Sequence, residues 1–173
     1  MPVMPERAGS GAKHRPLREP GMNEAAAPAS ILAFDYGTRR IGVAVGQTVT
    51  GSASPLATLR NGDGGPDFAS IENLVREWRP DQVVVGQPRQ AHGSLGAVGE
   101  AAVAFGKVLE RYDLPVVMVD ERGSSREAEA VLRGARKAGP RGRIRKEQID
   151  AAAAVFIAER YLLSLQVGKM PAR

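Results

Sequence analysis

One acidic residue, Asp35, stands between two apolar stretches whose residue types are typical of neighbouring strands. The first stretch covers residues 31–34, and Gly37 turns the chain into the second, which begins at Ile41. Burying a carboxylate at the end of a strand is unfavourable unless a cation meets it. The sequence therefore predicts an antiparallel strand pair with a cation beside Asp35.

Two more acids occupy comparable positions far along the chain. Glu121 follows the apolar segment 115–119 and Asp120, and Asp150 precedes the apolar segment 151–157. Asp150 is predicted to lie in the first turn of a helix, where the helix dipole favours an anion. Three carboxylates at the ends of buried elements suggest a site for a divalent metal ion.

Each acid also has a simpler explanation. Asp35 could stabilise a turn, and Glu121 could pair with Arg122 on the surface. Asp150 could be an acid of the ordinary kind found at helix starts. These alternatives stay open on spacing alone.

The composition limits which metal such a site could take. The chain contains no cysteine and two histidines, His14 and His92. Disulfides, thiolate-bound zinc and cysteine nucleophiles are excluded, and a catalytic zinc bound by histidines is disfavoured. Serine–histidine chemistry would depend on His92. Oxygen ligands remain, and they predict Mg²⁺ or Mn²⁺.

Positive charge is concentrated in one stretch, residues 133–146. The net charge is +5, and this stretch holds seven cations and no acid, so the rest of the chain is slightly acidic. Such a block is either a solvated loop or a contact for a polyanion, and its position just before Asp150 favours the polyanion. The residues predicted to contact nucleic acid are Thr38, Arg39, Arg40, Arg141, Arg143, Arg145 and Lys146.

The chain is expected to hold a single domain at residues 30–165. Residues 1–29 are rich in Pro, Gly and Ala and predict a disordered head, residues 166–173 form a short tail, and Met22 is an alternative start to Met1. The longest apolar run, residues 151–158, is far shorter than the roughly 20 residues of a membrane span. A cytoplasmic protein without membrane contact is expected.

Apolar periodicity predicts an α/β fold. The expected order is three antiparallel strands, then helices alternating with two parallel strands, with helices on both faces of a five-stranded mixed sheet. The expected strands are 31–35, 40–46, 52–59, 82–85 and 115–119, and the expected helices are 67–78, 95–112, one from Ser124 to about 135, and 146–165. With the first, fourth and fifth strands side by side, Asp35 and Glu121 would be about 10 Å apart at the backbone.

Four segments resemble the YqgF family in order and spacing, and the resemblance covers about residues 30–165. They are residues 34–44 (FDYGTRRIGVA), 84–88 (VVGQP), 120–122 (DER) and 150–154 (DAAAA). Members of that family are described as pre-16S rRNA nucleases and were earlier proposed as Holliday junction resolvases. The resemblance implies a ribonuclease H-like fold, and it implies metal-dependent hydrolysis by Asp35, Glu121 and Asp150.

The chain departs from the family pattern in two places. Gln87 replaces a leucine, with Gln90 and His92 standing where an Asn and an Asp are usual, and residues 123–125 (GSS) replace Leu-Thr-Thr or Leu-Ser-Thr. The three acids are retained, so the departures concern the positioning of substrate. No family role is transferred to Arg89 or His92.

We therefore predict hydrolysis of a phosphodiester, with Asp35 bridging two Mg²⁺ ions and Glu121 and Asp150 each completing one coordination shell. The substrate is a structured RNA precursor or branched DNA, and endonuclease or exonuclease action and a homodimer stay open. One alternative is a sugar kinase or actin-like ATPase, which shares an Asp-x-Gly-Thr turn but needs two domains. Another is a nucleic-acid-binding module without catalysis.

Overall fold

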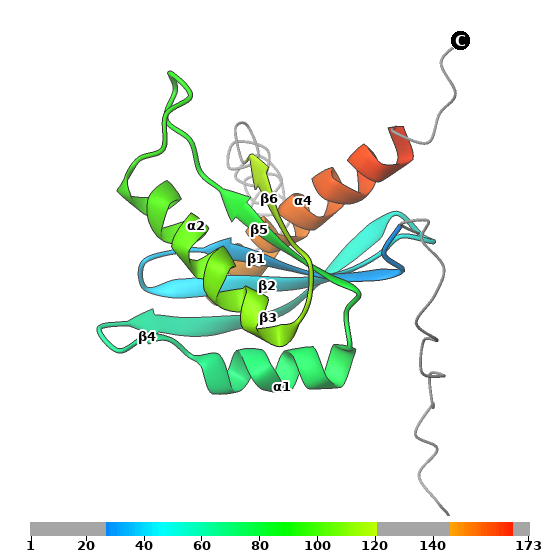
Figure 1. Cartoon of the computed structure of the whole chain (residues 1–173), viewed down its shortest axis with the longest axis horizontal. Helices are drawn as coiled ribbons and strands as arrows, with labels where there is room; N and C mark the ends of the chain where they lie inside the picture. Colours follow the sequence, from blue (N-terminus) through cyan, green and yellow to red (C-terminus); the bar gives the residue numbers. More distant parts are fainter. Residues whose placement is uncertain (1–26, 121–145, 168–173) are drawn as a thin grey trace, which may run out of the picture.

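Within residues 27–120 and 146–167, which the computed structural model describes, six strands form one mixed sheet (Figure 1). The strand order is β4-β3-β2-β1-β5-β6. The strands are β1 (Ser30–Tyr36), β2 (Arg40–Gln47), β3 (Ser52–Gly62), β4 (Gly65–Pro66), β5 (Gln82–Gln87) and β6 (Val116–Asp120). Strands β1 to β4 pair antiparallel, whereas β5 and β6 run parallel to β1.

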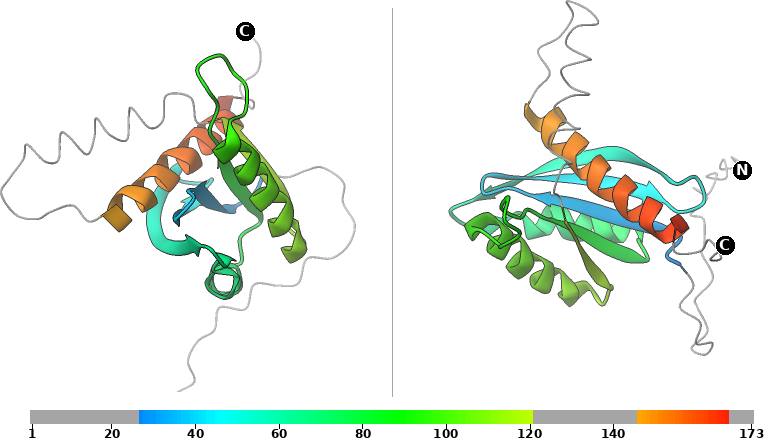
Figure 2. Two further views of the ribbon diagram at one scale, coloured as in Figure 1. Left: turned by 90° about the vertical axis from the view of Figure 1, so that its left-hand side faces the viewer. Right: turned by 90° about the horizontal axis from the view of Figure 1, so that it is seen from above.

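Helices cover both faces of this sheet (Figure 2). Helices α1 (Phe68–Trp78) and α2 (Ala97–Leu109) pack on one face, and the 3₁₀ turn η1 (Glu110–Tyr112) continues α2. Helix α4 (Lys146–Val167) lies on the other face and contacts β1, β2, β3 and β5. No helix in the described ranges is long and apolar enough to cross a membrane.

The α/β architecture predicted from the sequence is confirmed, including the adjacency of β1, β5 and β6. The predicted number of strands, five, is wrong. Residues 61–66 were expected to form a loop, but Asn61 and Gly62 extend β3 and pair with Pro66 and Gly65, which creates the short strand β4. The helix expected from Ser124 to about 135 lies outside the described residues.

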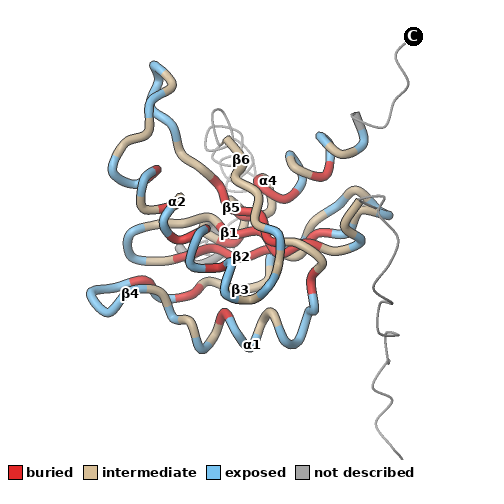
Figure 3. The backbone as a smooth tube through the Cα atoms, viewed as in Figure 1, coloured by how far each residue is buried: buried red, intermediate tan, exposed pale blue. Residues whose placement is uncertain are grey.

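Alternation along β1 divides the core in two. Leu32 and Phe34 point into the larger cluster with α1 and α2, whereas Ile31 and Ala33 point toward α4. All four are fully buried, and buried backbone follows the middle of the sheet (Figure 3). A central strand that is apolar on both faces explains why residues 31–34 form a continuous apolar run.

On the face under α4, the strand β2 contributes very small residues. A Cβ atom added to Gly42 would lie 1.9 Å from the backbone oxygen of Asp150, which no real contact allows. A Cβ on Gly46 would lie 2.9 Å from Ile31 Cγ1 and 3.1 Å from Leu162 Cδ1. Glycine at these two positions therefore lets α4 approach the backbone of β2 closely.

Candidate active site

Asp35 lies near the end of β1, on the face that carries α4. It is paired across the strands with Gly42, and alternation from Ile31 and Ala33 turns its side chain toward that helix. Burial, and to a smaller extent the negative charge of Asp150, raises the pKa of the Asp35 carboxyl to about 6. Asp35 therefore sits where its own charge is unfavourable without a cation.

Helix α4 brings Asp150 to the same place. The backbone oxygen of Asp150 packs over Gly42, the cross-strand partner of Asp35, and its Oδ2 atom is buried. Arg40 Nη1 lies 3.9 Å from this Oδ2. Two acids that are far apart in the sequence thus converge on one point of the sheet, next to a guanidinium group.

The prediction that Asp150 lies in the first turn of its helix is wrong. Helix α4 begins at Lys146, so Asp150 is its fifth residue and lies just over one turn inside. The interpretation of Asp150 as a helix-start acid loses support for the same reason. The effect of a helix dipole falls off within the first turn, so the dipole of α4 acts on Asp150 less strongly than predicted.

The chemistry of this point fits a hard divalent cation. Both side chains offer carboxylate oxygens. A metal ion would offset the cost of burying the Asp35 charge and the repulsion between Asp35 and Asp150. In the described part of the chain, no group of three or more acidic or histidine side chains is gathered in a way that could hold a metal. Glu121, the predicted third ligand, lies outside the described residues.

The turn between β1 and β2 carries the predicted nucleic-acid contacts Thr38, Arg39 and Arg40. Thr38 and Arg39 are exposed, and the Arg40 side chain is 35% exposed. Asn61, which is 3% exposed, donates from Nδ2 to the carbonyl of Gly37 at 2.7 Å. Its backbone N–H also donates to the carbonyl of Arg39 at 2.9 Å.

The role of Asn61 was missed by sequence reasoning. Its neighbours Gly62, Asp63 and Gly64 are typical of a loop, in which an asparagine is unremarkable. Only the pairing of β3 with β2 places Asn61 beside the turn after Asp35. A polar residue buried in this way must satisfy its donors internally, and it does so on the turn.

Comparison with known proteins decides the family. The RuvX family, described as "Holliday junction resolvase", matches residues 29–164. The chain belongs to this family. A "Putative pre-16S rRNA nuclease" from Burkholderia lata is 47% identical over 135 residues, which cover 78% of this chain and 89% of the relative. A protein of the same description from Chromohalobacter salexigens is 46% identical over 132 residues, covering 76% of this chain and 87% of the relative.

A solved structure supports the fold of this RuvX-family chain. T. thermophilus RuvC in complex with Holliday junction substrate matches with a TM-score of 0.53 and 16% identity, covering 81% of this chain and 96% of that one. At this identity the likeness shows the fold alone. The ribonuclease H-like fold and the family resemblance predicted from the sequence are confirmed.

The altered loop after β5 is tied to the end of β6 in this RuvX-family protein. Arg89 donates from Nη2 to Gln87 Oε1 at 3.1 Å and from Nη1 to the carbonyl of Gly93 at 2.9 Å. Its Nε lies 3.9 Å from Asp120 Oδ2. Gln87, which departs from the family pattern, therefore helps to position Arg89. His92 is exposed and its Nε2 lies 2.7 Å from Ser94 Oγ.

The basic block is only partly described. Arg141, Arg143 and Arg145 lie outside the described residues, and Lys146 is the first residue of α4. The predicted contacts of these residues with nucleic acid therefore stay predictions.

Proposed function

We propose that this protein is a metal-dependent nuclease that hydrolyses a phosphodiester bond during maturation of the 5′ end of small-subunit ribosomal RNA. The observation that carries this proposal is the convergence of Asp35 and Asp150 beside Arg40. Relatives that are 46–47% identical over 132–135 residues are described as "Putative pre-16S rRNA nuclease".

We assign the metal ligands to Asp35, Asp150 and Glu121. Glu121 follows Asp120, the last residue of β6, and β6 is separated from β1 only by β5. When bound, two Mg²⁺ ions, or Mn²⁺, would activate the attacking water and stabilise the leaving oxygen. Asp35 would take part in holding both ions, and Asp150 and Glu121 would each help to hold one of them.

The remaining residues bind and orient the substrate. Arg40, held 3.9 Å from Asp150, is placed to meet a phosphate oxygen next to the carboxylates. Thr38 and Arg39 are exposed on the same turn and can hold the neighbouring backbone. The cations up to the start of α4 (Arg141, Arg143, Arg145 and Lys146) would hold more distant phosphates by charge without reading the sequence.

A second candidate substrate is branched DNA, because the family that matches residues 29–164 is described as "Holliday junction resolvase". Cutting a four-way junction symmetrically requires two active sites, so this function would require a homodimer. A ribosomal precursor does not impose that requirement. The assay below therefore includes both nucleic acids.

The test is Mg²⁺-dependent cleavage of two substrates: an RNA that spans the 5′ end of the mature small-subunit rRNA, and a synthetic four-way junction. We expect the wild-type protein to cut the RNA and Asp35→Asn to reduce the rate by about 100-fold or more. Asp113→Asn is the matched control, because Asp113 is exposed and precedes β6, which runs parallel to β1, so it lies at the end of the sheet away from Asp35.

Undiminished cleavage by Asp35→Asn would refute the proposed mechanism. Cleavage of the junction alone would favour the resolvase. Binding of RNA that persists in EDTA without any cleavage in Mg²⁺ would favour a binding module. In cells depleted of the protein, we expect small-subunit rRNA with an extended 5′ end that wild-type protein corrects and Asp35→Asn does not.

A further inference from the structure

Two arginines stand directly opposite each other at the end of the sheet that carries the candidate active site. Arg40 in β2 is the cross-strand partner of Arg60 in β3. The next pair along, Ile41 and Leu59, points into the core under α1 and α2. Because side chains alternate along a strand, Arg40 and Arg60 must both point to the other face, where α4 and Asp35 lie.

Two like charges in directly opposed positions destabilise an antiparallel strand pair. Each arginine has an acid nearby: Arg40 lies 3.9 Å from Asp150, and Arg60 interacts electrostatically with the fully exposed Asp67. Asp150 is also assigned as a ligand of the metal ion, and this ion would compete with Arg40 for the Asp150 carboxylate. Two opposed cations retained beside a nuclease site are therefore suited to a shared anionic ligand.

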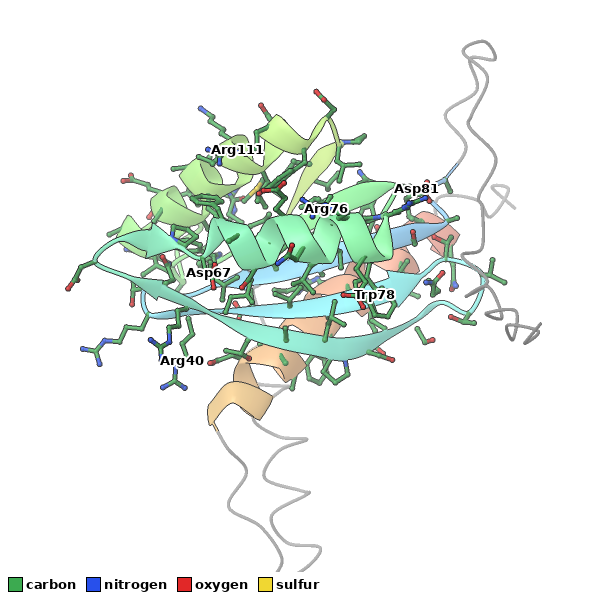
Figure 4. All side chains as sticks on the ribbon, turned by 90° about the horizontal axis from the view of Figure 1, so that it is seen from below. Arg40, Asp67, Arg76, Trp78, Asp81 and Arg111 are labelled. Atoms are coloured by element: carbon green, nitrogen blue, oxygen red, sulfur yellow. The ribbon has the colours of Figure 1, made fainter. Side chains whose placement is uncertain are left out.

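Asn61 fixes the geometry of this pair. It follows Arg60 in β3 and holds the turn before Arg40 through its hydrogen bonds to the carbonyls of Gly37 and Arg39. Asp67, which lies near Arg60, and Arg40 are seen at the same end of the sheet, away from Trp78 and Asp81 (Figure 4). The two arginines thus project from a backbone that is cross-linked by a buried side chain.

We infer that Arg60 and Arg40 together bind one phosphate of the nucleic-acid backbone, next to the phosphodiester that is cleaved. This inference rests on the proposed nuclease function and adds Arg60 as a substrate-binding residue and Asn61 as a positioning residue. The contact is to phosphate, so it strengthens binding of every sequence equally. The guanidinium forks of the two side chains can each donate two hydrogen bonds to phosphate oxygens.

The experiment measures binding of a fluorescein-labelled single-stranded RNA across a series of salt concentrations. It uses the Asp35→Asn protein in EDTA, so that cleavage does not interfere. Each phosphate neutralised on a single strand contributes about 0.7 to the slope of log K against log salt. We expect Arg60→Gln to reduce the slope by up to about that amount, since Arg40 still contacts the shared phosphate, and to weaken binding several-fold at low salt.

Arg76→Gln is the matched control. Arg76 is an exposed arginine on α1, which covers the opposite face, and it pairs with Glu72 at 2.8 Å. We expect it to leave the slope unchanged, and Arg60→Lys to retain the slope because it keeps the charge. An Arg60→Gln protein with the slope of Arg76→Gln would overturn the inference.

Asn61→Ala separates positioning from simple stabilisation. We expect this variant to weaken RNA binding at a temperature where circular dichroism shows that it is folded. A lower melting temperature with unchanged binding would show that Asn61 only stabilises the fold. These RNA-binding measurements need no cleavage. The inference about Arg60 can therefore fail while the cleavage test of Asp35→Asn supports the nuclease, and it can hold while that cleavage test fails.

Discussion

The two faces of the sheet differ most in the residues that β2 contributes to them. Under α1 and α2, the core contains large residues such as Phe34, Ile41 and Phe105, with the rings of Phe34 and Phe105 in edge contact at 5.7 Å. Under α4, the strand β2 contributes Gly42, Ala44 and Gly46. The first face buries apolar volume, whereas the second allows close approach of a helix to the backbone.

The two faces therefore contribute differently to the stability of the fold and to the geometry of the candidate active site. Fully burying a large apolar side chain contributes about 1.5–3 kcal/mol, which favours the face under α1 and α2 as the main source of stability. Small side chains contribute less burial, but they allow α4 to place Asp150 over the strand position opposite Asp35. The candidate active site therefore depends on the face that is packed with the smaller residues.

The strongest test of this comparison is Gly42→Ala. The added Cβ would lie 1.9 Å from the backbone oxygen of Asp150, so either α4 or β2 must move. We expect a loss of about 3 kcal/mol in the free energy of unfolding and loss of Mg²⁺-dependent cleavage. Gly64→Ala is the matched control, because nothing lies within 4 Å of a Cβ there. Wild-type stability and cleavage in Gly42→Ala would contradict the close approach of α4.

The second prediction concerns the metal-free protein and pH. Burial, and then the charge of Asp150, raises the pKa of Asp35 from 3.8 to about 6, so the folded state binds a proton more tightly than the unfolded state. This contribution to stability is complete below pH 3.8 and is lost as the pH rises through about 6. The expected loss is roughly 2–3 kcal/mol.

Denaturant unfolding in EDTA at several pH values measures this effect. Asp35→Asn lacks the titrating group, so the difference between wild type and Asp35→Asn should change between pH 4 and pH 7, with the variant more stable at pH 7. If the difference in the free energy of unfolding between the two proteins does not vary with pH, the pKa of Asp35 is not raised by burial and by the charge of Asp150.

The smallest effect is expected on the opposite face. Phe105→Leu keeps an apolar side chain of similar size and should lower the free energy of unfolding by about 1 kcal/mol. It does not touch the face of Asp35 and Asp150, so cleavage per folded molecule should change by less than about twofold. Thermal unfolding and the cleavage assay check both statements. A large loss of activity at full folding would show that the two faces are not separable.

The local features of this fold could be predicted from the sequence. Alternation and turn chemistry indicate β1, the turn at Gly37 and β2, and apolar runs indicate β5 and β6 in their observed parallel arrangement. The absence of cysteine, with only His14 and His92 as nitrogen donors, also predicts oxygen ligands for a metal ion, and this stays a prediction.

The features that were not predicted from the sequence depend on contacts between distant residues. Pairing of Gly62 with Gly65 adds a strand that the loop-like composition conceals. Asn61 acquires its role only when β3 pairs with β2 beside the turn. The packing of Asp150 over Gly42 cannot be seen in either local sequence, since each residue is ordinary for its own element.

The central claim is that Asp35 and Asp150 hold a divalent cation together. Isothermal titration calorimetry of Mn²⁺ into wild type, Asp35→Asn, Asp150→Asn and the control Asp113→Asn at pH 7.5 tests it most directly. We expect wild type and Asp113→Asn to bind Mn²⁺ alike, and either single change at Asp35 or Asp150 to weaken binding by about tenfold or more. Equal Mn²⁺ affinity in all four proteins, or no Mn²⁺ binding by the wild type, would contradict it.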